Sequence, residues 1–429
     1  MNKLTIKAGS SLKGEVKIPG DKSISHRAII LASIAEGTSR ITNFLSGEDC
    51  ISTVNIMRAA GVEIEMAEDY VRVSGASLFG LKEPEDVVDA GNSGTTTRLL
   101  SGLFAAQNFF TVITGDRYLR KRPMNRVVEP LRLMGASITG RDGGNKLPIA
   151  ISGAKLKGIT YHSPIASAQV KSSILLAGLS AEGITTVYEP SLSRDHSERM
   201  LMAMGAKARR LEDGGFSVEG GHPLSAVDIE VPGDISSAAF FMVAGLIVEG
   251  SHIVLKSVGV NPTRTGVIDI LLAMGGDIKL ENERDVAGEP VADIVIKAGP
   301  LKGIEIAGDL IPRAIDELPV VAVAAAFAEG TTIVREAKEL RVKESDRISA
   351  ITGELKKLGA NIEEREDGFV VEGGAPLSGA EVQSYDDHRI AMSMAVAALK
   401  AIGETSICDP ECVNISFPGF FDLLKSIQR

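Results

Sequence analysis

The feature that most constrains the fold is a long unit that recurs six times along the chain. Each copy carries a turn, usually centred on glycine, between a helix-like apolar segment and a β-branched strand; the turns lie at residues 36–38, 107–108, 182–183, 249–251, 329–331 and 402–403. A second glycine ends the next helix-like segment at residues 60–61, 134–136, 204–206, 274–276 and 358–360, where positive φ favours glycine. The spacing of about 65–80 residues exceeds that of solenoid repeats and predicts a βαβαββ module.

The third copy shows the module most clearly. Helical periodicity over residues 167–180 is followed by a predicted strand at 184–188 and a second predicted helix at 195–204. Two alternating segments, 207–211 and 216–219, then predict a pair of strands. We therefore expect an α/β protein built from six βαβαββ repeats.

The sixth copy lacks closing strands after its helical segment at residues 420–428. Residues 6–9 and 12–14 echo residues 296–299 and 301–303, so we expect the N-terminal strands to complete the last module. Three modules would then form an inserted domain, residues 20–233, and the other three a discontinuous domain made of residues 1–19 and 234–429. Pro-Gly pairs at 19–20 and 232–233 mark the two chain crossings. We expect the active site in the interdomain cleft, because ligand sites favour domain interfaces.

Composition narrows the possible partners. A formal net charge of −10 argues against nucleic acid or an anionic membrane as the main partner. The sequence shows no run of 18 apolar residues and no signal-peptide core, so we expect a cytoplasmic protein without a membrane anchor. Cys50, Cys408 and Cys412 form neither a disulfide framework nor a zinc motif, so no metal is expected.

Residues 20–27 have the composition of an anion site at a helix N-terminus. Ser23 is a plausible N-cap, Lys22 lies beside the positive end of the helix, and Arg27 shares the face of Ser23. The alternative is a capped surface helix with solvated charges. His26 is more simply explained as a structural residue than as a catalytic one.

Comparable helix starts occur further along the chain. The Gly91–Arg98 segment opens a helix with small residues, and the basic segment 116–123, which contains Arg122, needs a neutralising partner or solvent. The segments around Gln169 and Arg194 also open helices, and their hydroxyl, amide and cationic groups suit a phosphorylated, polyhydroxylated molecule. Each of these signals is unspecific alone, because Ser and Asp caps are common.

The densest charged segment is residues 341–347. On a helix, Lys343 and Arg347 would share one face, although an ion-paired surface helix would look similar. Asp316 lies among apolar residues of the same module, which would disturb its pKa and suit a general base. Arg389 opens the first helix of the sixth module; the alternative there is an Asp cap followed by a solvated arginine.

Together, these motifs resemble those of 5-enolpyruvylshikimate-3-phosphate synthase. The residues that carry the resemblance are 20–27, 91–98, 121–124, 167–169, 341–347 and 387–389, in order and over essentially the whole chain. The segments 167–169 and 194–198 are similar to those of the second bacterial class of these enzymes. The resemblance implies an inside-out α/β fold with two domains of three βαβαββ repeats each.

The family resemblance implies a carboxyvinyl transfer between two small molecules. The 5-hydroxyl of shikimate 3-phosphate attacks C2 of phosphoenolpyruvate while C3 takes a proton, and the tetrahedral intermediate then expels phosphate. No cofactor is implied, and the small-molecule substrates require neither a nucleic acid nor a membrane. The expected state is a monomer. Concentrated cations would screen the repulsion between the two anionic substrates.

The resemblance also implies roles for individual residues. Catalysis is expected from Asp316 as the base that accepts the hydroxyl proton, and from Glu344 with Lys22 as proton donors to C3. Shikimate 3-phosphate would contact Lys22, Ser23, Arg27, Ser167, Ala168, Gln169, Arg194, Asp316 and Lys343. Phosphoenolpyruvate would contact Lys22, Gly94, Arg122, Gln169, Arg347 and Arg389.

Two alternatives remain open on the sequence. The sister carboxyvinyltransferase that acts on UDP-N-acetylglucosamine resembles this chain, but it usually has a cysteine in the loop that matches residues 116–123, where this sequence has none. A non-catalytic repeat scaffold that binds acidic partners would place its basic residues over an outer surface. Such a scaffold would have no need for Asp316 or Glu344.

Overall fold

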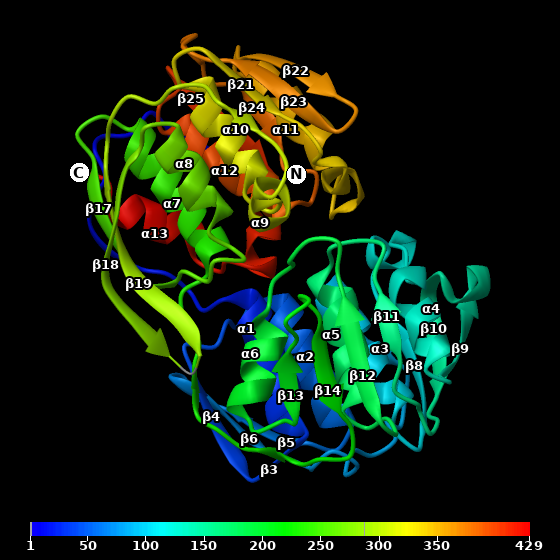
Figure 1. Cartoon of the computed structure of the whole chain (residues 1–429). Helices are drawn as coiled ribbons and strands as arrows, with labels where there is room; N and C mark the ends of the chain where they lie inside the picture. Colours follow the sequence, from blue (N-terminus) through cyan, green and yellow to red (C-terminus); the bar gives the residue numbers. More distant parts are fainter. Residues whose placement is uncertain (1, 287) are drawn as a thin grey trace. The chain divides into compact units, whose positions relative to one another are not determined.

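The computed structural model describes residues 2–286 and 288–429, which form two compact units (Figure 1). The C-terminal unit comprises the chain up to Pro19 together with Pro232–Asp285 and Pro290–Arg429, and the inserted unit comprises Gly20–Val231 with Val286, Gly288 and Glu289. The chain thus changes unit beside each Pro-Gly pair. The grouping of Glu289 with the inserted unit was not anticipated. It has a physical cause, since Glu289 Oε1 lies 2.8 Å from Nδ1 of the buried His196.

The inserted unit repeats one sheet pattern. Among its described residues, the sheets have the strand orders β16-β4-β6-β5, β7-β8-β10-β9 and β11-β12-β14-β13, with a short pair β15-β3. In each larger sheet the first two strands are parallel and the later neighbours antiparallel. The strands are β3 (Ala35–Glu36), β4 (Thr38–Thr42), β5 (Glu63–Met66), β6 (Tyr70–Ser74), β7 (Val88–Asp89), β8 (Phe110–Thr114), β9 (Ser137–Arg141), β10 (Lys146–Ser152), β11 (Thr160–His162), β12 (Ile184–Tyr188), β13 (Ala208–Arg210), β14 (Phe216–Glu219), β15 (Leu224–Ser225) and β16 (Ile229–Glu230).

The C-terminal unit uses the same pattern and recruits the N-terminal strands. Its described sheets have the orders β18-β19-β17-β2, β20-β21-β23-β22 and β1-β25-β24. The strands are β1 (Lys3–Lys7), β2 (Lys13–Lys17), β17 (His252–Gly259), β18 (Asp277–Val286), β19 (Glu289–Lys297), β20 (Glu305–Ile306), β21 (Thr331–Val334), β22 (Asn361–Arg365), β23 (Gly368–Glu372), β24 (Glu381–Gln383) and β25 (Glu404–Cys408).

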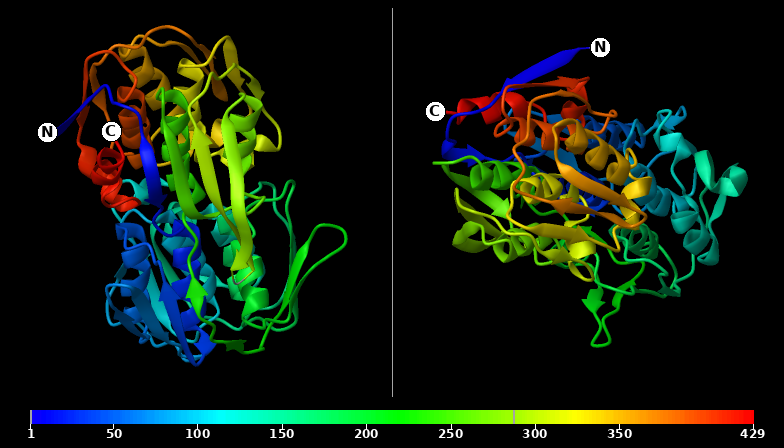
Figure 2. Two further views of the ribbon diagram at one scale, coloured as in Figure 1. Left: turned by 90° about the vertical axis from the view of Figure 1, so that its left-hand side faces the viewer. Right: turned by 90° about the horizontal axis from the view of Figure 1, so that it is seen from above.

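The two N-terminal strands enter different modules. Strand β1 pairs antiparallel with β25, with Leu4 opposite Ile407, and so supplies a strand that the sixth module lacks. Strand β2 instead pairs parallel with β17 at the edge of the fourth module. Lys13 N also donates to Ile427 O, which places the first residues beside the last helix, as Figure 2 shows in blue and red. The expectation that both strands close the last module is therefore wrong for β2.

Each module contributes two helices. In the inserted unit these are α1 (Lys22–Ser33), α2 (Glu48–Ala59), α3 (Gly94–Ala105), α4 (Asn125–Leu133), α5 (Ala168–Gly178) and α6 (His196–Ala203). In the C-terminal unit they are α7 (Ile235–Ile247), α8 (Gly266–Ala273), α10 (Leu318–Ala326), α11 (Arg347–Lys357), α12 (His388–Ala398) and α13 (Phe420–Ser426), with the short α9 (Leu310–Ala314) before α10. Single 3₁₀ turns are η1 (Leu119–Lys121), η2 (Asp142–Gly144), η3 (Lys338–Val342) and η4 (Pro410–Ile415).

Helices occupy the core of each unit, with the sheets outside them. Every residue of α7, α10 and α12 is buried, and these three helices pack against one another in the C-terminal unit. In the inserted unit, α3 packs against α1 and α5. A helix that is apolar on all sides must be buried, which explains the inside-out arrangement. This structure confirms the expected class of two-domain inside-out α/β fold.

No helix among the described residues combines the length and the apolar composition needed to cross a membrane.

Candidate active site

In the C-terminal unit, the carboxylate of Asp316 faces three cations. Its Oδ1 lies 3.2 Å from Arg347 Nη1 and 3.4 Å from Lys343 Nζ, and its Oδ2 lies 4.0 Å from Arg389 Nη2. Arg389 Nη1 also donates to the backbone oxygen of Asp316 at 3.1 Å. The sequence predicted apolar surroundings for Asp316. That expectation is wrong for its carboxylate, because the apolar residues that follow it in sequence lie within α10 and are buried in the core.

The residues around Asp316 come from three helix starts. Asp316 lies between α9 and α10, Arg347 is the first residue of α11, and Arg389 is the second residue of α12. A cation at a helix N-terminus is unfavourable, because the helix dipole is positive there. Each arginine therefore needs carboxylate partners. Glu344 Oε2 accepts from Arg347 Nη2 at 2.6 Å and so joins this group.

Asp387 completes the group. Its side chain caps α12 by accepting from Arg389 N at 2.9 Å, and it also accepts from Arg347 Nε and from the hydroxyl of Ser345. Burial alone raises the pKa of such a carboxyl, but the charge and hydrogen bond of Arg347, together with His388, leave the pKa of Asp387 below its ordinary value. Burial likewise opposes the charge of Arg347, yet the carboxylates around it raise its pKa.

The segment 341–347 is not one helix. Residues 338–342 form η3, residues 343–346 are irregular, and Asp346 caps α11 by accepting from Ser349 N at 3.1 Å. Lys343 and Arg347 therefore meet at Asp316 through the bend between η3 and α11 rather than through a shared helix face. Arg341 points elsewhere, donating to Asp346 and to the backbone oxygen of Glu366.

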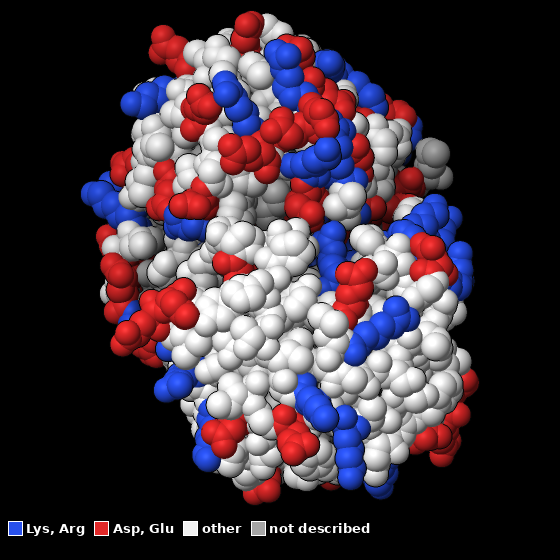
Figure 3. Space-filling model, turned by 45° about the vertical axis from the view of Figure 1, so that its right-hand side comes forward, with Lys and Arg blue, Asp and Glu red and all other residues white. Residues whose placement is uncertain are grey.

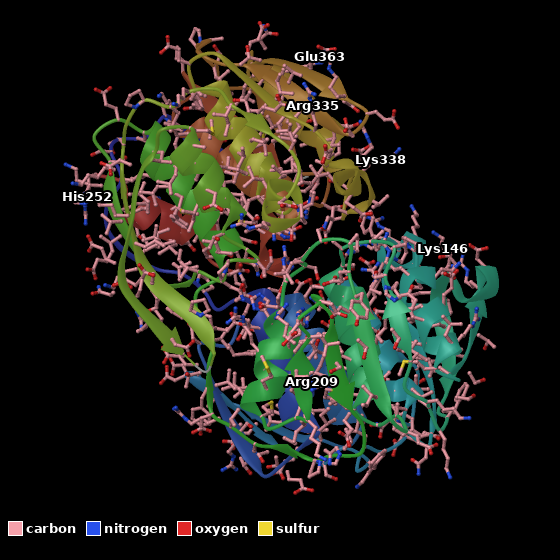
Figure 4. All side chains as sticks on the ribbon, viewed as in Figure 1. Lys146, Arg209, His252, Arg335, Lys338 and Glu363 are labelled. Carbon is pink, nitrogen blue, oxygen red and sulfur yellow. The ribbon has the colours of Figure 1, made fainter. Side chains whose placement is uncertain are left out.

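Other cations of the fifth module carry exposed ion pairs. Lys338 lies 2.8 Å from Glu366 and Arg335 lies 3.5 Å from Glu305, and all four side chains are more than half exposed. Figure 4 shows Arg335 and Lys338 at the surface of this unit. On the face drawn in Figure 3, Lys and Arg side chains mingle with Asp and Glu over the C-terminal unit. The buried pair of Arg347 and Asp387 therefore differs from the unit's ordinary surface charges.

In the inserted unit, the first helix start holds Lys22 beside an acidic partner. Lys22 Nζ lies 3.2 Å from Asp49 Oδ2, and Asp21 caps α1 by accepting from Ile24 N at 2.9 Å. The expectation that Ser23 is the N-cap is therefore wrong. Ser23 is the second residue of α1, because the side chain of Asp21 supplies the acceptor that a cap requires.

Arg27 is buried in the inserted unit. It donates from Nε to Ser197 Oγ at 2.7 Å, from Nη2 to Ser172 Oγ at 2.8 Å and from Nη1 to Ser23 O at 2.9 Å. Burial lowers the pKa of Arg27 to about 10, and the charge of nearby Arg194 adds to that effect. This arginine therefore joins α1 to α5 and α6, which the sequence did not predict.

The second helix start brings Gly94 close to two guanidinium groups. A Cβ at Gly94 would lie 2.9 Å from Arg98 Nη1 and 3.2 Å from Arg122 Nη1. Arg122 Nη2 donates to Asn92 Oδ1 at 2.9 Å, and Arg98 Nη1 donates to Gln169 Oε1 at 2.5 Å. Small residues are therefore needed here, since any side chain would displace an arginine.

Asp116 orders the basic loop 116–123, in which it lies. Asp116 Oδ1 accepts from the backbone N–H groups of Tyr118 and Leu119, which begins η1, and its Oδ2 accepts from Asn92 Nδ2 at 2.7 Å. Lys146, labelled in Figure 4, donates to the backbone oxygen of Lys121. These contacts hold the loop against the start of α3.

The starts of α5 and α6, the two helices of the third module, carry Ser167–Gln169 and Arg194. Ser167 is the N-cap of α5 but makes no side-chain capping bond, and Gln169 Nε2 donates to Thr95 Oγ1 at 3.0 Å. Ala168 is the first residue of α5. Arg194 directly precedes Asp195, the N-cap of α6. The side chain of Ser167 is thus not committed to capping.

The structure divides the predicted residues between the units. Those of the inserted unit are Lys22, Ser23, Arg27, Gly94, Arg122, Ser167, Ala168, Gln169 and Arg194. Those of the C-terminal unit are Asp316, Lys343, Glu344, Arg347 and Arg389. Several of these residues, among them Lys22, Gly94, Arg347 and Arg389, lie at or next to helix N-termini.

Three supporting residues were missed as members of the site. The sequence indicates Asp387 only as a helix cap, and Asn92 only as part of a small-residue helix start. Asp49 gave no signal, because it lies 27 residues from Lys22 and reaches it only through packing of α2 on α1. Among the described residues, no cluster of three or more His, Cys, Asp or Glu side chains could hold a metal ion.

Comparison with known proteins gives a consistent result. The model of the family described as EPSP synthase (3-phosphoshikimate 1-carboxyvinyltransferase) matches residues 6–424. The 3-phosphoshikimate 1-carboxyvinyltransferase of Geobacter sulfurreducens is 58% identical over 417 residues, covering 97% of both chains. That of Syntrophotalea carbinolica is 58% identical over 425 residues, covering 99% of this chain and 98% of its own.

Solved structures agree in fold. An EPSP synthase structure from Acinetobacter baumannii has a TM-score of 0.90 and 49% identity, covering 99% of this chain and 98% of its own. The enolpyruvyl transferase NikO from Streptomyces tendae has a TM-score of 0.80 at 18% identity, covering 99% of this chain and 97% of its own. At that identity the second likeness shows the fold alone.

Proposed function

Because the chain belongs to the EPSP synthase family, we propose that its two groups of helix-start residues carry out one reaction. The enzyme transfers the enolpyruvyl group of phosphoenolpyruvate to shikimate 3-phosphate, a step of aromatic biosynthesis. The product is 5-enolpyruvylshikimate 3-phosphate, and phosphate leaves. The observation that carries the assignment of roles is the position of Asp316 among Lys343, Arg347 and Arg389.

The first half of the reaction needs one proton removed and one added. Asp316 accepts the proton of the 5-hydroxyl as its oxygen bonds to C2 of phosphoenolpyruvate. Glu344, with Lys22, donates a proton to C3, which gives a tetrahedral ketal. General acid–base transfer of this kind typically contributes about 10²–10⁴-fold to a rate.

In the second half, C3 loses a proton and the bond between C2 and the phosphate oxygen breaks, so that phosphate leaves. Arg122, Arg347 and Arg389 hold phosphoenolpyruvate and stabilise the departing phosphate, as cations do in phosphoryl sites. Gly94 and Gln169 also face this substrate. Shikimate 3-phosphate is held by Ser23, Arg27, Ser167, Ala168, Gln169, Arg194 and Lys343, with Lys22 and Asp316 next to its reacting hydroxyl.

We propose from this division of roles that the domains 20–233 and 1–19 plus 234–429 both contribute residues that act on the same pair of substrates. Two anions draw cations from both units together, and domain closure of this kind excludes water. Small-angle scattering with and without shikimate 3-phosphate tests the idea. An unchanged radius of gyration at saturating ligand would count against it.

We further propose that the enzyme works as a cytoplasmic monomer without nucleic acid. The net charge of −10 supports the absence of a nucleic-acid partner, because it repels polyanions. Light scattering of the purified protein measures the mass directly, and a dimer would contradict the proposal.

Phosphate release tests the reaction itself. With phosphoenolpyruvate and shikimate 3-phosphate together, we expect release of one phosphate per product, and none with either substrate alone. UDP-N-acetylglucosamine in place of shikimate 3-phosphate is the matched control and should give no release. The full-length relatives named above support the shikimate substrate.

A further inference from the structure

We infer that Glu189 is a positioning residue that holds the two loops carrying Ser167–Gln169 and Arg194 at the spacing that shikimate 3-phosphate requires. The inference rests on the proposed placement of that substrate. Glu189 follows strand β12 and precedes α6, and it belongs to none of the motifs that carry the family resemblance.

One carboxylate reaches both loops. Glu189 Oε1 accepts from the backbone N–H of Ser167 at 3.1 Å and from the hydroxyl of Ser193 at 2.6 Å. Its Oε2 also accepts from the backbone N–H of Ser193 at 3.4 Å. Ser167 is the N-cap of α5, and Ser193 directly precedes Arg194. The carboxylate therefore ties the start of α5 to the loop before α6.

Lys171 offsets part of the negative charge that this arrangement introduces. Its Nζ lies 2.6 Å from Glu189 Oε2 and 2.8 Å from Glu198 Oε1, and the side chain is 3% exposed. A bare carboxylate beside an anion-binding loop would repel a phosphate, and a buried lysine next to it weakens that repulsion. With Lys171 beside it, Glu189 can supply two acceptor oxygens at a smaller cost to an anion site than a bare carboxylate would.

The residues at the N-cap positions of α5 and α6 do not take over the contacts that Glu189 makes. Ser167 and Asp195 occupy the cap positions of α5 and α6, yet neither side chain makes a capping bond at its own helix. The N–H of Ser167 is bound by Glu189 instead, which leaves the Ser167 hydroxyl uncommitted to capping. Loss of Glu189 would release both loops together.

Steady-state phosphate release by the full-length enzyme tests the inference. For Glu189→Gln we expect the KM for shikimate 3-phosphate to rise about tenfold, because a neutral amide keeps one acceptor but loses the charged partner of Lys171. The KM for phosphoenolpyruvate and kcat, measured at saturating shikimate 3-phosphate, should stay within about twofold. Glu189→Ala should raise the same KM further. Glu182→Gln, an exposed glutamate just before β12, is the matched control and should change nothing.

Three results would overturn the inference. The first is a KM for shikimate 3-phosphate within twofold of wild type in Glu189→Gln. The second is an equal rise of both KM values, which would indicate general disruption. The third is a loss of thermal stability in Glu189→Gln without a change in either KM, as expected of a merely structural residue.

Gln169→Ala separates failure of the inference from failure of the substrate placement. If Gln169→Ala raises the KM for shikimate 3-phosphate and Glu189→Gln does not, only the positioning role is wrong. If Gln169→Ala leaves that KM unchanged, the placement of the substrate on this loop is wrong, and the role of Glu189 is overturned with it.

Discussion

Arg347 donates from Nε to Asp387 Oδ2 at 2.8 Å and from Nη2 to Asp387 Oδ1 at 3.3 Å. The two side chains are 1% and 0% exposed. Because Asp387 also caps α12 through the backbone N–H of Arg389, one buried carboxylate fixes both arginines that we propose to hold phosphoenolpyruvate.

Asp387→Ala should therefore lower stability and weaken phosphoenolpyruvate binding together. Removing one partner of a buried pair leaves an uncompensated charge, and the expected loss in the free energy of unfolding is about 3–5 kcal/mol. Urea denaturation measures it, and the KM for phosphoenolpyruvate should rise in parallel. Glu363→Gln breaks the exposed pair with Arg365 and is the control (Figure 4). Its effect should stay within about 0.5 kcal/mol, so equal losses in the two variants would contradict the prediction.

Asp316→Ala should lower kcat by about 100- to 10,000-fold, because it removes the proposed base. Shikimate 3-phosphate binding, measured by calorimetry, should remain largely intact. Asp309→Ala changes an exposed aspartate near the start of α9 and should keep wild-type turnover. If binding collapses as far as turnover in Asp316→Ala, the residue is a binding group rather than the base.

Gly94→Ala should raise the KM for phosphoenolpyruvate while leaving the fold stable. The new methyl group would meet the Nη1 atoms of Arg98 and Arg122 at 2.9 and 3.2 Å, and these flexible side-chain ends can move aside. Their displacement alters the anion site. An unchanged KM for phosphoenolpyruvate would show that binding does not depend on the observed position of the Arg122 guanidinium.

Gly353→Ala should raise the stability of the protein and leave its catalysis unchanged. Gly353 lies inside α11, and a Cβ there would meet nothing within 4 Å. Alanine loses less backbone entropy on helix formation, so the free energy of unfolding should rise by about 0.5–1 kcal/mol. Chemical denaturation checks this, and kinetic constants should not change. A destabilised variant would contradict the open space that the structure shows.

The free energy of unfolding should decrease in mild acid, because His26 is buried. Its Nδ1 lies 2.7 Å from Thr53 Oγ1, and burial, with the charges of Lys22 and Arg27, lowers its pKa well below the ordinary value. The folded protein therefore keeps His26 neutral, while the unfolded chain takes up a proton below about pH 6.5. The unfolded state then binds more protons, so the free energy of unfolding decreases as pH falls, by up to about 1.4 kcal/mol per unit from this residue.

Urea denaturation between pH 7.5 and 5 of wild type and His26→Asn measures this contribution. The variant should lose part of the pH slope while keeping a polar partner for Thr53. His252→Gln replaces an exposed histidine on β17 and should retain the wild-type slope. Identical slopes for wild type and His26→Asn would contradict the prediction.

Much of the fold follows from local sequence. Glycines such as Gly205 and Gly275 have positive φ after α6 and α8, as the repeat predicted. The helix and strand order of the third module also follows, because hydrophobic periodicity sets both. Pairing of β1 with β25 could be inferred only from the echo between distant segments, and the separate place of β2 could not, since both strands carry similar patterns.

The candidate site was less predictable than the fold. Motifs identified Lys343, Arg347 and Asp316, but a helix was expected where η3 and a bend occur. Ser23 was expected to cap α1, although Asp21 does so. Asp21 caps α1 from a position two residues before Ser23, and Asp346 caps α11 from a position three residues after Lys343. Sequence spacing alone does not decide which of several neighbouring polar residues becomes the cap.

The sequence by itself determined the repeat, the fold class and the family, because these depend on periodicity, on glycine conformation and on motifs that lie contiguous in the chain. Only the tertiary structure decided which charges meet. Asp387 reaches Arg347 across 40 residues, and Arg27 reaches Ser197 across 170. Such pairs depend on how buried helices pack against one another. No local pattern records that packing, so the partners that hold each cation became visible only in the folded chain.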